Sequence, residues 1–488
     1  MVRESPALGE FSLHYGGAKQ SAQGTGVLEL RSPATRQLLA SVPEASDADV
    51  SAAADAAAAA APQWAATDSG ERARLLRALA ELMRSRMGEL SDMESAVTGR
   101  PIREMRAQMS RIPEWLEYFA GIILGVEGES NRVKGGFLTY SSLEPYGVCA
   151  LLTPWNHPIL ILVKKMAAAL AAGNVCLIKP SELAPVSPLI LAEWCTEAGL
   201  PPGTVNVVTG GAEVGRAVCS NANVRRIDLT GGTETGRRVA AAAAERLIPC
   251  TLELGGKAPI IIAEDANVEE AVAGSIFAAF VAAGQTCVSG TRFIVAQKSY
   301  KEFIERIAKR AEALRVGDPA DTMTDMGPVI SAQAQARCID HISAAKVAGA
   351  RLIAGGDKPL ELPAALRQGF YVKPTVFADV NSQMRLFREE VFGPVLAAMT
   401  VSGLDEALSL ANASCYALSS SVFTSDVGSA LTYIREIEAG VAHVNIHTGY
   451  KTPELPFGGW KDSGYGVPEN ARTALEFFVN RKAVYMRS

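Results

Sequence analysis

Short apolar runs alternate with helix-forming segments along the first half of the chain. Runs typical of strands lie at 149–152, 175–178, 206–208 and 227–230, and helical patterns follow them at 158–172, 188–197, 214–219 and 235–245. This alternation predicts a parallel sheet covered by helices. Two further helices are predicted upstream, in the alanine-rich segment 47–64 and at 71–87, where leucines recur at helical spacing.

A second series of strand-like runs begins after Lys257. The runs lie between helical segments at 259–263, 292–295, 351–354, 371–377, 395–401 and 420–423. We expect a second α/β domain here. Two more strand-like segments, 136–143 and 476–486, fit neither layer pattern. Because an isolated strand needs a pairing partner, we predict that these two segments build a small oligomerisation element.

Polar residues cluster where the first predicted strands end. The clusters lie at 153–157, 179–182, 209–213 and 230–234. In an open parallel sheet, ligands bind at the carboxyl ends of the strands. We therefore expect these polar clusters to face one crevice.

The composition indicates a globular protein of two or three domains. The chain of 488 residues is too long for a single core, and 48% of its residues are hydrophobic. The net charge of −5 comes from interspersed charges, so nucleic acid is not an expected partner. No apolar run approaches the roughly 18 residues of a membrane span, and the N-terminus lacks a signal-like apolar region. We expect no membrane partner and a cytoplasmic location.

One of the eight cysteines has an unusual setting. Cys287 lies in the polar, glycine-flanked run 284–290, which is typical of a tight loop that approaches a ligand. Upstream, Glu253 lies in the run Leu-Glu-Leu-Gly-Gly-Lys; a thiol nucleophile and a carboxylate base are the minimum needed to make and hydrolyse a thioester. The other cysteines show no CxxC spacing and the five histidines are scattered, so we expect reduced thiols and no metal.

Two turns at the predicted strand ends are typical of nucleotide sites. The segment 230–236, Thr-Gly-Gly-Thr-Glu-Thr-Gly, follows a strand and opens a helix, where backbone N–H groups can bind a phosphate. Such glycines also occur in turns for conformational reasons alone. In Lys179-Pro180-Ser181-Glu182 the lysine and the carboxylate can bind a ribose from two sides. The alternative is that this segment is an ordinary surface turn. A carboxylate there repels a 2′-phosphate, which favours NAD over NADP.

The order of these and further motifs resembles the aldehyde dehydrogenase superfamily, in its NAD(P)-dependent, non-acylating form, over nearly the whole chain. The motifs are Pro-Trp-Asn-His-Pro at 154–158, Lys-Pro-Ser-Glu at 179–182, Thr-Gly-Gly-Thr-Glu at 230–234, Leu-Glu-Leu-Gly-Gly-Lys at 252–257, Gly-Gln-Thr-Cys at 284–287, Glu-Glu-Val-Phe-Gly-Pro-Val at 389–395 and Pro-Phe-Gly-Gly at 456–459.

The resemblance assigns the chemistry residue by residue. It makes Cys287 the nucleophile that attacks the aldehyde as a thiolate, with the Asn156 amide and the Cys287 backbone N–H holding the oxyanion. It makes Glu253 the general base that activates water for deacylation. Lys165 matches a family lysine near the nucleotide ribose and the proton path; otherwise it is a lysine on a helix surface.

The resemblance also implies a cofactor, NAD, with NADP possible. Glu390 would hold the nicotinamide ribose and Phe392 would pack beside it. The cofactor residues that it implies are Thr153, Pro154, Trp155, Lys179, Ser181, Glu182, Gly211, Gly215, Thr230, Gly231, Gly232, Thr233, Leu254, Glu390 and Phe392. The chain departs from the family pattern at Gly232, where many members have serine, which makes the cofactor preference less secure. It also has Val467-Pro468 in place of the usual Arg-Glu, which we expect to affect packing more than chemistry.

The substrate is expected to be a small-molecule aldehyde. By the resemblance, His157, Ile161 and Lys164 line its path to the nucleophile. A cation at Lys164 in an apolar tunnel would favour an anionic substrate, such as a carboxylate-bearing semialdehyde or an aromatic carboxy-aldehyde. The alternative is that Lys164 and Lys165 lie on a solvated helix face.

Three rival functions remain. A CoA-acylating semialdehyde dehydrogenase would not need the Glu253 base, a cysteine hydrolase would need a histidine base, and a non-catalytic scaffold of the same fold would have no use for Cys287, Glu253 and Asn156 together. We expect a homodimer or homotetramer. The predicted fold is α/β, with a Rossmann-like nucleotide-binding domain (1–122 and 146–253), a second α/β catalytic domain (254–469) and a β-strand oligomerisation element (123–145 and 470–488).

Overall fold

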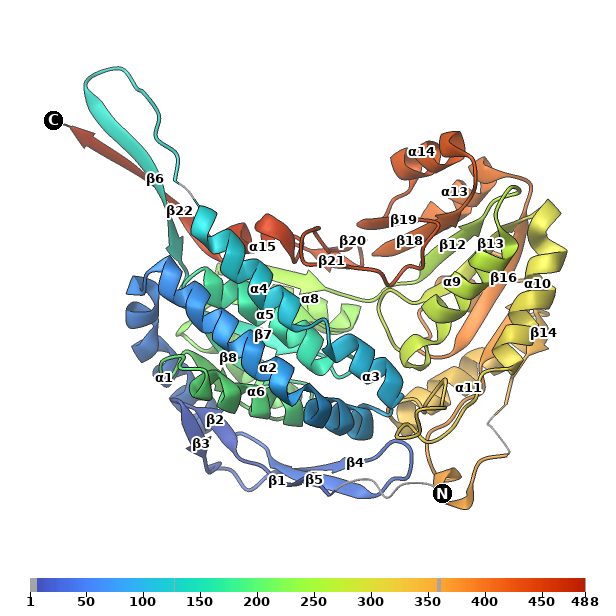
Figure 1. Cartoon of the computed structure of the whole chain (residues 1–488), viewed down its shortest axis with the longest axis horizontal. Helices are drawn as coiled ribbons and strands as arrows, with labels where there is room; N and C mark the ends of the chain where they lie inside the picture. Colours follow the sequence, from blue (N-terminus) through green and yellow to red (C-terminus); the bar gives the residue numbers. More distant parts are fainter. Residues whose placement is uncertain (1–6, 127, 358–360, 488) are drawn as a thin grey trace.

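Two helix-covered β-sheets lie side by side in the molecule (Figure 1). The structure is a computed structural model that describes residues 7–126, 128–357 and 361–487. The first sheet has the strand order β21-β11-β10-β7-β8-β9-β2-β3 and is parallel from β11 to β9. Its strands are β2 (Leu13–Tyr15), β3 (Ala18–Gln20), β7 (Val148–Thr153), β8 (Val175–Pro180), β9 (Val205–Val207), β10 (Val224–Thr230), β11 (Cys250–Glu253) and β21 (Gly464–Tyr465).

Helices cover both faces of the first sheet. Helices α5 and α6 pack on one face with α2 and α4 outside them, while α7 and α8 contact the sheet and each other. The helices are α1 (Asp47–Ala66), α2 (Ser69–Thr98), α4 (Pro113–Ile122), α5 (Pro158–Ala171), α6 (Val186–Glu197), α7 (Ala212–Ser220) and α8 (Thr233–Glu245). The chain runs outward from β7 to β9 and then returns to β10 on the other side of β7. A ligand crevice is expected at this reversal of strand order.

The second sheet has the strand order β14-β15-β16-β13-β12-β18-β19, and only β14 is antiparallel to its neighbour. Its strands are β12 (Ala258–Ile262), β13 (Gly290–Ala296), β14 (Arg351–Ala354), β15 (Thr375–Ala378), β16 (Val395–Val401), β18 (Ser419–Phe423) and β19 (Val441–Val444). The helices of this lobe are α9 (Val268–Phe280), α10 (Gln297–Glu312), α11 (Ala332–Val347), α12 (Arg385–Arg388), α13 (Leu404–Asn412) and α14 (Val427–Glu436).

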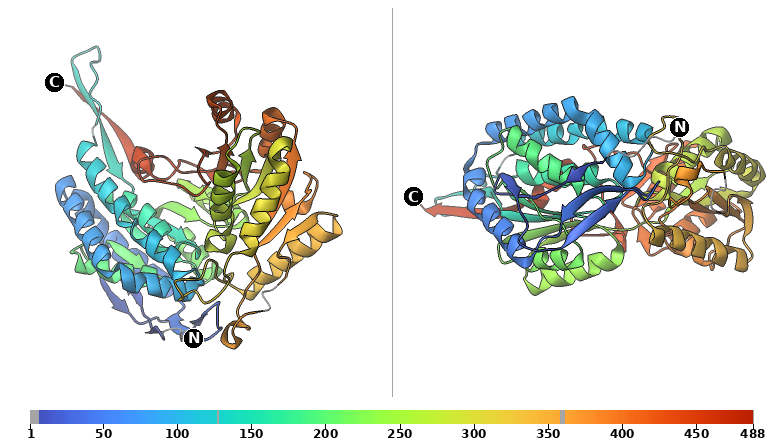
Figure 2. Two further views of the ribbon diagram at one scale, coloured as in Figure 1. Left: turned by 45° about the vertical axis from the view of Figure 1, so that its right-hand side comes forward. Right: turned by 90° about the horizontal axis from the view of Figure 1, so that it is seen from below.

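A two-stranded arm projects from the first lobe (Figures 1 and 2). It consists of β6 (Phe137–Pro145) and β22 (Val479–Arg487), which pair antiparallel over their full lengths. Leu138, Tyr140, Tyr485 and Met486 are exposed on it. The smaller elements are β1 (Gly9–Glu10), β4 (Val27–Arg31), β5 (Leu38–Pro43), α3 (Ile102–Met109), β17 (Tyr416–Ala417), β20 (Trp460–Lys461), α15 (Ala471–Phe477) and the 3-10 turns Ile123–Gly125, Val281–Gly284 and Ala364–Leu366.

The last part of the chain returns from the second lobe to the first, along the top of Figure 1. Strand β21 pairs with β11 at the edge of the first sheet, and the side chains of Leu475 and Phe477 in α15 join the first hydrophobic core. The first sheet is therefore completed by residues from the end of the chain.

The predicted α/β class is confirmed, and most predicted elements overlap observed ones. The strand predicted at 371–377 begins only at Thr375, because Pro374 has no N–H to donate to a ladder and the Lys373 N–H donates to the Asp357 carbonyl. The strand predicted at 476–486 begins at Val479, because Phe477 ends α15 with its ring in the core. The helix predicted at 71–87 continues to Thr98.

The predicted domain limits stay a prediction. No helix in the described ranges is long and apolar enough to cross a membrane.

Candidate active site

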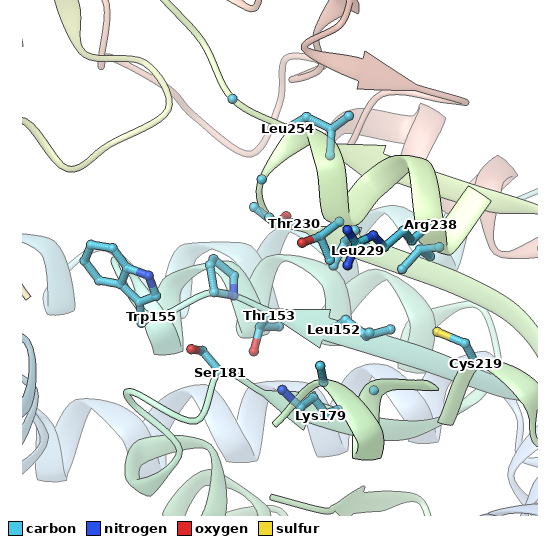
Figure 3. Close-up of a pocket in the computed structure, with 18 of the residues that line it drawn as sticks. Leu152, Thr153, Trp155, Lys179, Ser181, Cys219, Leu229, Thr230, Arg238 and Leu254 are labelled. Carbon is cyan, nitrogen blue, oxygen red and sulfur yellow. The ribbon is translucent and has the colours of Figure 1, made fainter. Parts of the chain in front are cut away.

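A cavity of about 990 Å³ opens at the carboxyl ends of β7, β8 and β10. Figure 3 shows Leu152 and Thr153 of β7 and Lys179 of β8 facing Leu229 and Thr230 of β10 across it. The cavity brings together most of the residues predicted to bind a cofactor: Thr153, Pro154, Trp155, Lys179, Ser181, Glu182, Gly211, Gly215, Thr230, Gly231, Gly232, Leu254, Glu390 and Phe392. Cys287, Asn156 and Ile161 line the same cavity. His157 and Lys164 are not part of its lining.

Thr233 is the one predicted cofactor residue outside the cavity lining. Its hydroxyl donates to the Asp462 carbonyl at 3.2 Å, so it ties α8 to the returning C-terminal segment. Thr233 is the first residue of α8, and its side chain points toward a partner far away in the chain.

The N-terminus of α8 is open toward the cavity. Gly232 is its N-cap residue and provides no side-chain cap. The hydroxyls of Thr153 and Thr230 are buried and have no hydrogen-bond partner among the described residues. Free helix N–H groups and unpaired hydroxyls are the donors that a pyrophosphate accepts from. These residues fit the diphosphate of a dinucleotide.

Lys179 and Glu182 stand at the end of β8, with 3.5 Å between the ammonium nitrogen and the carboxylate. Burial lowers the pKa of Lys179 from its usual value, while the pairing with Glu182 opposes that change. Ser181 lies beside Lys179 in Figure 3. The pair is therefore placed to receive two vicinal hydroxyls of a ribose.

Glu390 enters the cavity against the backbone of the second lobe. The Gly256 N–H donates to Glu390 Oε1 at 2.9 Å, and a Cβ at Gly255 would lie only 2.5 Å from Oε2. Residue 255 must therefore be glycine for the carboxylate to approach this closely. Burial raises the pKa of Glu390 to about 7.

The loop before Cys287 has an unusual backbone. Ala282, Ala283 and Gly284 all have positive φ, at 52°, 52° and 72°. A left-handed non-glycine residue costs on the order of 1 kcal/mol. At Gly284 a Cβ would also lie 2.4 Å from the Gly393 carbonyl oxygen. The loop is thus held in a conformation that its own residues do not favour.

Side chains on either side fix this loop. The Ala282 N–H donates to the Glu104 carboxylate at 3.0 Å. The side-chain amide of Gln285 donates to the Ala282 carbonyl at 3.0 Å, and the side-chain oxygen of Gln285 accepts from the Ile330 N–H at 2.9 Å. On the far side, the Thr448 hydroxyl donates to the Val288 carbonyl at 2.6 Å. These bonds position the intervening thiol.

Cys287 is partly buried among charges of both signs. Burial raises the pKa of its thiol. Lys451 is the charge that lowers this pKa most, Glu253 raises it, and Lys164 lowers it further. The thiol therefore lies close to a carboxylate and two ammonium groups.

Asn156 lies beside the thiol loop and is buried. Its amide nitrogen donates to the Gln285 carbonyl at 2.9 Å, which leaves its second N–H available. Its oxygen has no partner among the described residues. The amide orientation is therefore set by the residue two positions before Cys287.

Glu253 ends β11 and is buried. Burial raises its pKa well above the usual value, and the charge of Glu469 raises it further, while Lys165 and Lys164 oppose the shift. Its Oε2 atom has no partner in the described part of the chain. A carboxyl group with a raised pKa and a free oxygen is suited to accept a proton.

The helix-surface interpretation of Lys165 is wrong, whereas its place on a proton path stays a prediction. Lys165 is fully buried in α5, forms ion pairs with Asp228 and Glu469, and is not part of the cavity lining. The solvated-face reading of Lys164 is also wrong, because its ammonium is buried 2.9 Å from Glu469. Burial opposes ionisation of Glu469, but Lys164 and Lys165 outweigh it and lower its pKa to about 2.

The sequence analysis missed Glu469, Asp228 and Lys451. A signal was present for the first two, because two adjacent lysines in the apolar segment 158–171 need buried counter-charges. Pattern alone does not say where in the chain those carboxylates lie. The departure at Val467-Pro468 directly precedes Glu469, so this segment bears on charge as well as packing. The described residues contain no group of three His, Cys, Asp or Glu side chains arranged to hold a metal.

A sequence model described as the Aldehyde dehydrogenase family matches residues 19–484. The chain belongs to the aldehyde dehydrogenase family. As a member it is an oxidoreductase that oxidises an aldehyde to the carboxylic acid with NAD(P)+, which accounts for the nucleotide-type cavity that reaches Cys287.

Relatives of this aldehyde dehydrogenase align over nearly their full lengths. The betaine aldehyde dehydrogenase of Cereibacter sphaeroides (strain ATCC 17029 / ATH 2.4.9) is 43% identical over 457 residues, which cover 93% of this chain and 92% of the relative. The crystal structure of PnpE in complex with nicotinamide adenine dinucleotide has a TM-score of 0.95 at 38% identity and covers 98% of this chain and 97% of that chain. The NAD+ complex of an aldehyde dehydrogenase from Bacillus cereus has a TM-score of 0.94 at 34% identity, with coverages of 98% and 96%.

Proposed function

We propose that this protein is an NAD+-preferring, non-acylating aldehyde dehydrogenase in which Cys287 is the nucleophile and Glu253 the general base. The observation that carries the proposal is that Cys287 and Asn156 line the same cavity as the nucleotide-type residues. The charge of Glu253 also raises the pKa of the Cys287 thiol.

Cys287 attacks the aldehyde carbon as a thiolate, and the C–S bond forms as the carbonyl oxygen becomes an oxyanion. The second N–H of the Asn156 amide and the Cys287 backbone N–H hold that oxyanion. One such donor contributes about 2.7 to 4 kcal/mol to the stability of the transition state. The amide needs no reorientation, because its bond to Gln285 already fixes it.

When bound, NAD+ supplies the hydride acceptor that turns the thiohemiacetal on Cys287 into a thioester. Glu390 is placed to hold a ribose hydroxyl of the nicotinamide half, and Phe392 and Trp155 bound the same part of the cavity, with their rings 5.6 Å apart and edge to face. The role of these residues is orientation of the cofactor.

Glu253 takes a proton from the water that hydrolyses the thioester. Its raised pKa makes its ionised form a stronger base than an ordinary carboxylate. Behind it, Glu469 and Lys165 form a buried charged route by which the proton can leave.

NAD+ is favoured over NADP+ by Glu182. Its carboxylate accepts from ribose hydroxyls and repels a 2′-phosphate. The comparison that tests this is kcat/KM for both nicotinamide cofactors in wild type and in Glu182→Gln. We expect the NAD+ preference to fall by about 10-fold or more in the variant; an unchanged ratio would contradict the role of Glu182.

The rival reaction is CoA-dependent acylation. It is disfavoured because thiolysis needs no general base. Burying the Glu253 carboxylate opposes its ionisation, and an acylating enzyme would have no use for this residue. Purified enzyme, NAD+ and an aldehyde panel without CoA test the proposal. We expect one carboxylic acid per NADH; a reaction that turns over only with CoA would reject hydrolysis.

We also propose that 123–145 and 470–488 form the oligomerisation element of a homodimer or homotetramer, that 1–122 with 146–253 bind the nucleotide, and that 254–469 form the catalytic domain. The exposed apolar side chains of the arm support the first assignment. A cytoplasmic location is supported by the eight cysteines, all within the described ranges and all free.

A further inference from the structure

Lys451 lies in a loop that is hydrogen-bonded to the residue after the nucleophile. The loop connects β19 to β20, and the Thr448 hydroxyl in it donates to the carbonyl of Val288, the residue after Cys287. From the other side, Arg111 donates to the Lys451 carbonyl at 3.3 Å. The backbone of Lys451 is thus fixed relative to the thiol.

In the described ranges the ammonium of Lys451 forms no ion pair. Among the described residues no carboxylate lies within ion-pair distance of it and no hydrogen bond to it forms, whereas the neighbouring Lys164 is neutralised by Glu469 at 2.9 Å. Both ammonium groups face the ring of Phe457, Lys164 at 4.2 Å and Lys451 at 5.4 Å from its centre. A partly buried cation held by an aromatic ring alone is available to bind an anion.

The surroundings of Lys451 are electropositive. Its pKa is lowered to about 8 by burial and by the charge of Lys164, while Cys287 and Glu469 oppose the shift and Arg100 adds a smaller decrease, so it is still mostly protonated at neutral pH. Arg100 lies 2.9 Å from His157 Nδ1, and burial, Arg100 and Lys451 keep the pKa of His157 low. The His157 Nε2 atom is buried without a partner in the described part of the chain. In the described part of the chain, the Lys451 ammonium and the Nε2 atom of the His157 imidazole are therefore both without a hydrogen-bond partner.

We propose that Lys451, with Phe457 beside it, binds the anionic group of the substrate, so that the preferred substrates are carboxylate-bearing aldehydes. This deepens the proposed function and rests on it. It moves the anion site from Lys164, whose charge Glu469 already balances, to Lys451. It also disfavours betaine aldehyde, because its quaternary ammonium group would face an unpaired ammonium.

Alkylation of Cys287 tests the anion site without knowledge of the substrate. Iodoacetate and iodoacetamide react with the same thiolate by the same displacement, in which a C–S bond forms and iodide leaves, but only iodoacetate carries a carboxylate. Peptide mass spectrometry at Cys287 gives the rate for each reagent. In Lys451→Met we expect the iodoacetate-to-iodoacetamide rate ratio to fall by about 10-fold, with the ratio kept in Lys451→Arg.

Lys301→Met is the matched control, because Lys301 is an exposed lysine of α10 in the second lobe. Its rate ratio should equal that of wild type. If both reagents slow equally in Lys451→Met, the lysine only lowers the pKa of the thiol and the proposal is wrong. It is also wrong if neither rate changes.

Steady-state turnover with NAD+ provides the second readout. We expect kcat/KM to be higher for succinic semialdehyde than for butanal or betaine aldehyde, and Lys451→Met to lower it about 10- to 100-fold for succinic semialdehyde while that for butanal changes less than about 3-fold. Equal losses for both aldehydes would overturn the anion site. No NADH from any aldehyde would instead reject the proposed function, and the alkylation ratio would still decide the role of Lys451.

Discussion

At the residue scale, the pKa of the Cys287 thiol depends on its burial and on the charges around it. Burial and Glu253 favour the neutral thiol, whereas Lys451 and Lys164 favour the thiolate. A nucleophile in such surroundings is activated by the ammonium groups and can lose that activation when either is removed.

Replacement of the nucleophile separates chemistry from cofactor binding. Cys287→Ala should lower NADH production by at least about 10³-fold, because no other group can form the thioester. NAD+ affinity, measured by calorimetric titration, should stay within about 3-fold, since the cavity lining is otherwise intact. Cys415→Ala, at an exposed cysteine, is the control and should keep full activity. Substantial turnover by Cys287→Ala would remove the assignment.

Replacement of the base separates the two halves of the reaction. Glu253→Gln should slow deacylation by about 10²- to 10⁴-fold while leaving hydride transfer largely intact. Stopped-flow absorbance should then show a burst of NADH followed by a slow steady state, with thioester on Cys287 detectable by intact mass. A steady-state rate equal to wild type would mean that another group activates water.

The charge of Glu469 should be visible in the pH profile. Glu253 acts as a base only when deprotonated, so the rate falls as the pH drops through its pKa, which Glu469 helps to raise. Glu469→Gln removes that negative charge and frees Lys164 and Lys165 to act on Glu253, and both effects lower its pKa. The acid limb of kcat should therefore move to lower pH, whereas the exposed Glu454→Gln should leave it in place. An unmoved limb in Glu469→Gln would contradict the coupling.

At the element scale, the thiol loop is a strained connection between α9 and β13. Gly284→Ala would bring a Cβ to 2.4 Å from the Gly393 carbonyl oxygen at a positive φ. We expect a loss of about 2 kcal/mol or more in the free energy of unfolding and about 10²-fold in kcat, because the thiol is displaced.

Urea denaturation and steady-state kinetics measure both effects. The comparison variant is Gly88→Ala in the middle of α2, where a Cβ meets nothing within 4 Å. It should stabilise the protein by about 0.5 to 1 kcal/mol at unchanged kcat. If Gly284→Ala were as stable and active as Gly88→Ala, the loop would not be strained.

The sequence predicted those parts of the site that lie within one strand-to-helix unit. Thr153, Lys179 and Thr230 lie at the carboxyl ends of their strands and Glu182 follows β8, so parallel pairing alone brings them to one cavity. The ion pair of Lys165 was not predicted, because its partner Glu469 lies 304 residues away in the chain. Such a contact is set by the return of the C-terminal segment to the first sheet, which no local pattern encodes. Lys451 was missed for the same reason, since only the folded loop places it over Cys287.

At the scale of the whole molecule, the arm is a ribbon that cannot be stable by itself. A two-stranded ribbon is marginal in water, and Leu138 and Met486 are paired across it with 57% and 51% of their surfaces exposed. We expect another copy of the chain to pack on these exposed side chains, because exposed apolar patches of this kind are typical of subunit contacts.

The double variant Leu138→Glu/Met486→Lys tests the arm as an assembly element. The opposite charges lie across from each other, so the ribbon itself can still pair. We expect the oligomer to dissociate, with a lower molecular mass by size-exclusion chromatography and light scattering. Val347→Glu, at an exposed residue of α11, should keep the wild-type mass. An unchanged mass in the double variant would show that the arm does not hold the assembly together.

The two buried lysines of α5 receive part of their counter-charge only late in the synthesis of the chain. When residues up to Glu253 have emerged, nearly the whole first sheet is available, yet Lys164 and Lys165 still lack the carboxylate that arrives 304 residues after Lys165. Burying two ammonium groups beside only Asp228 is unfavourable. The charge balance of the first lobe is therefore complete only once the last tenth of the polypeptide has brought Glu469 to both lysines.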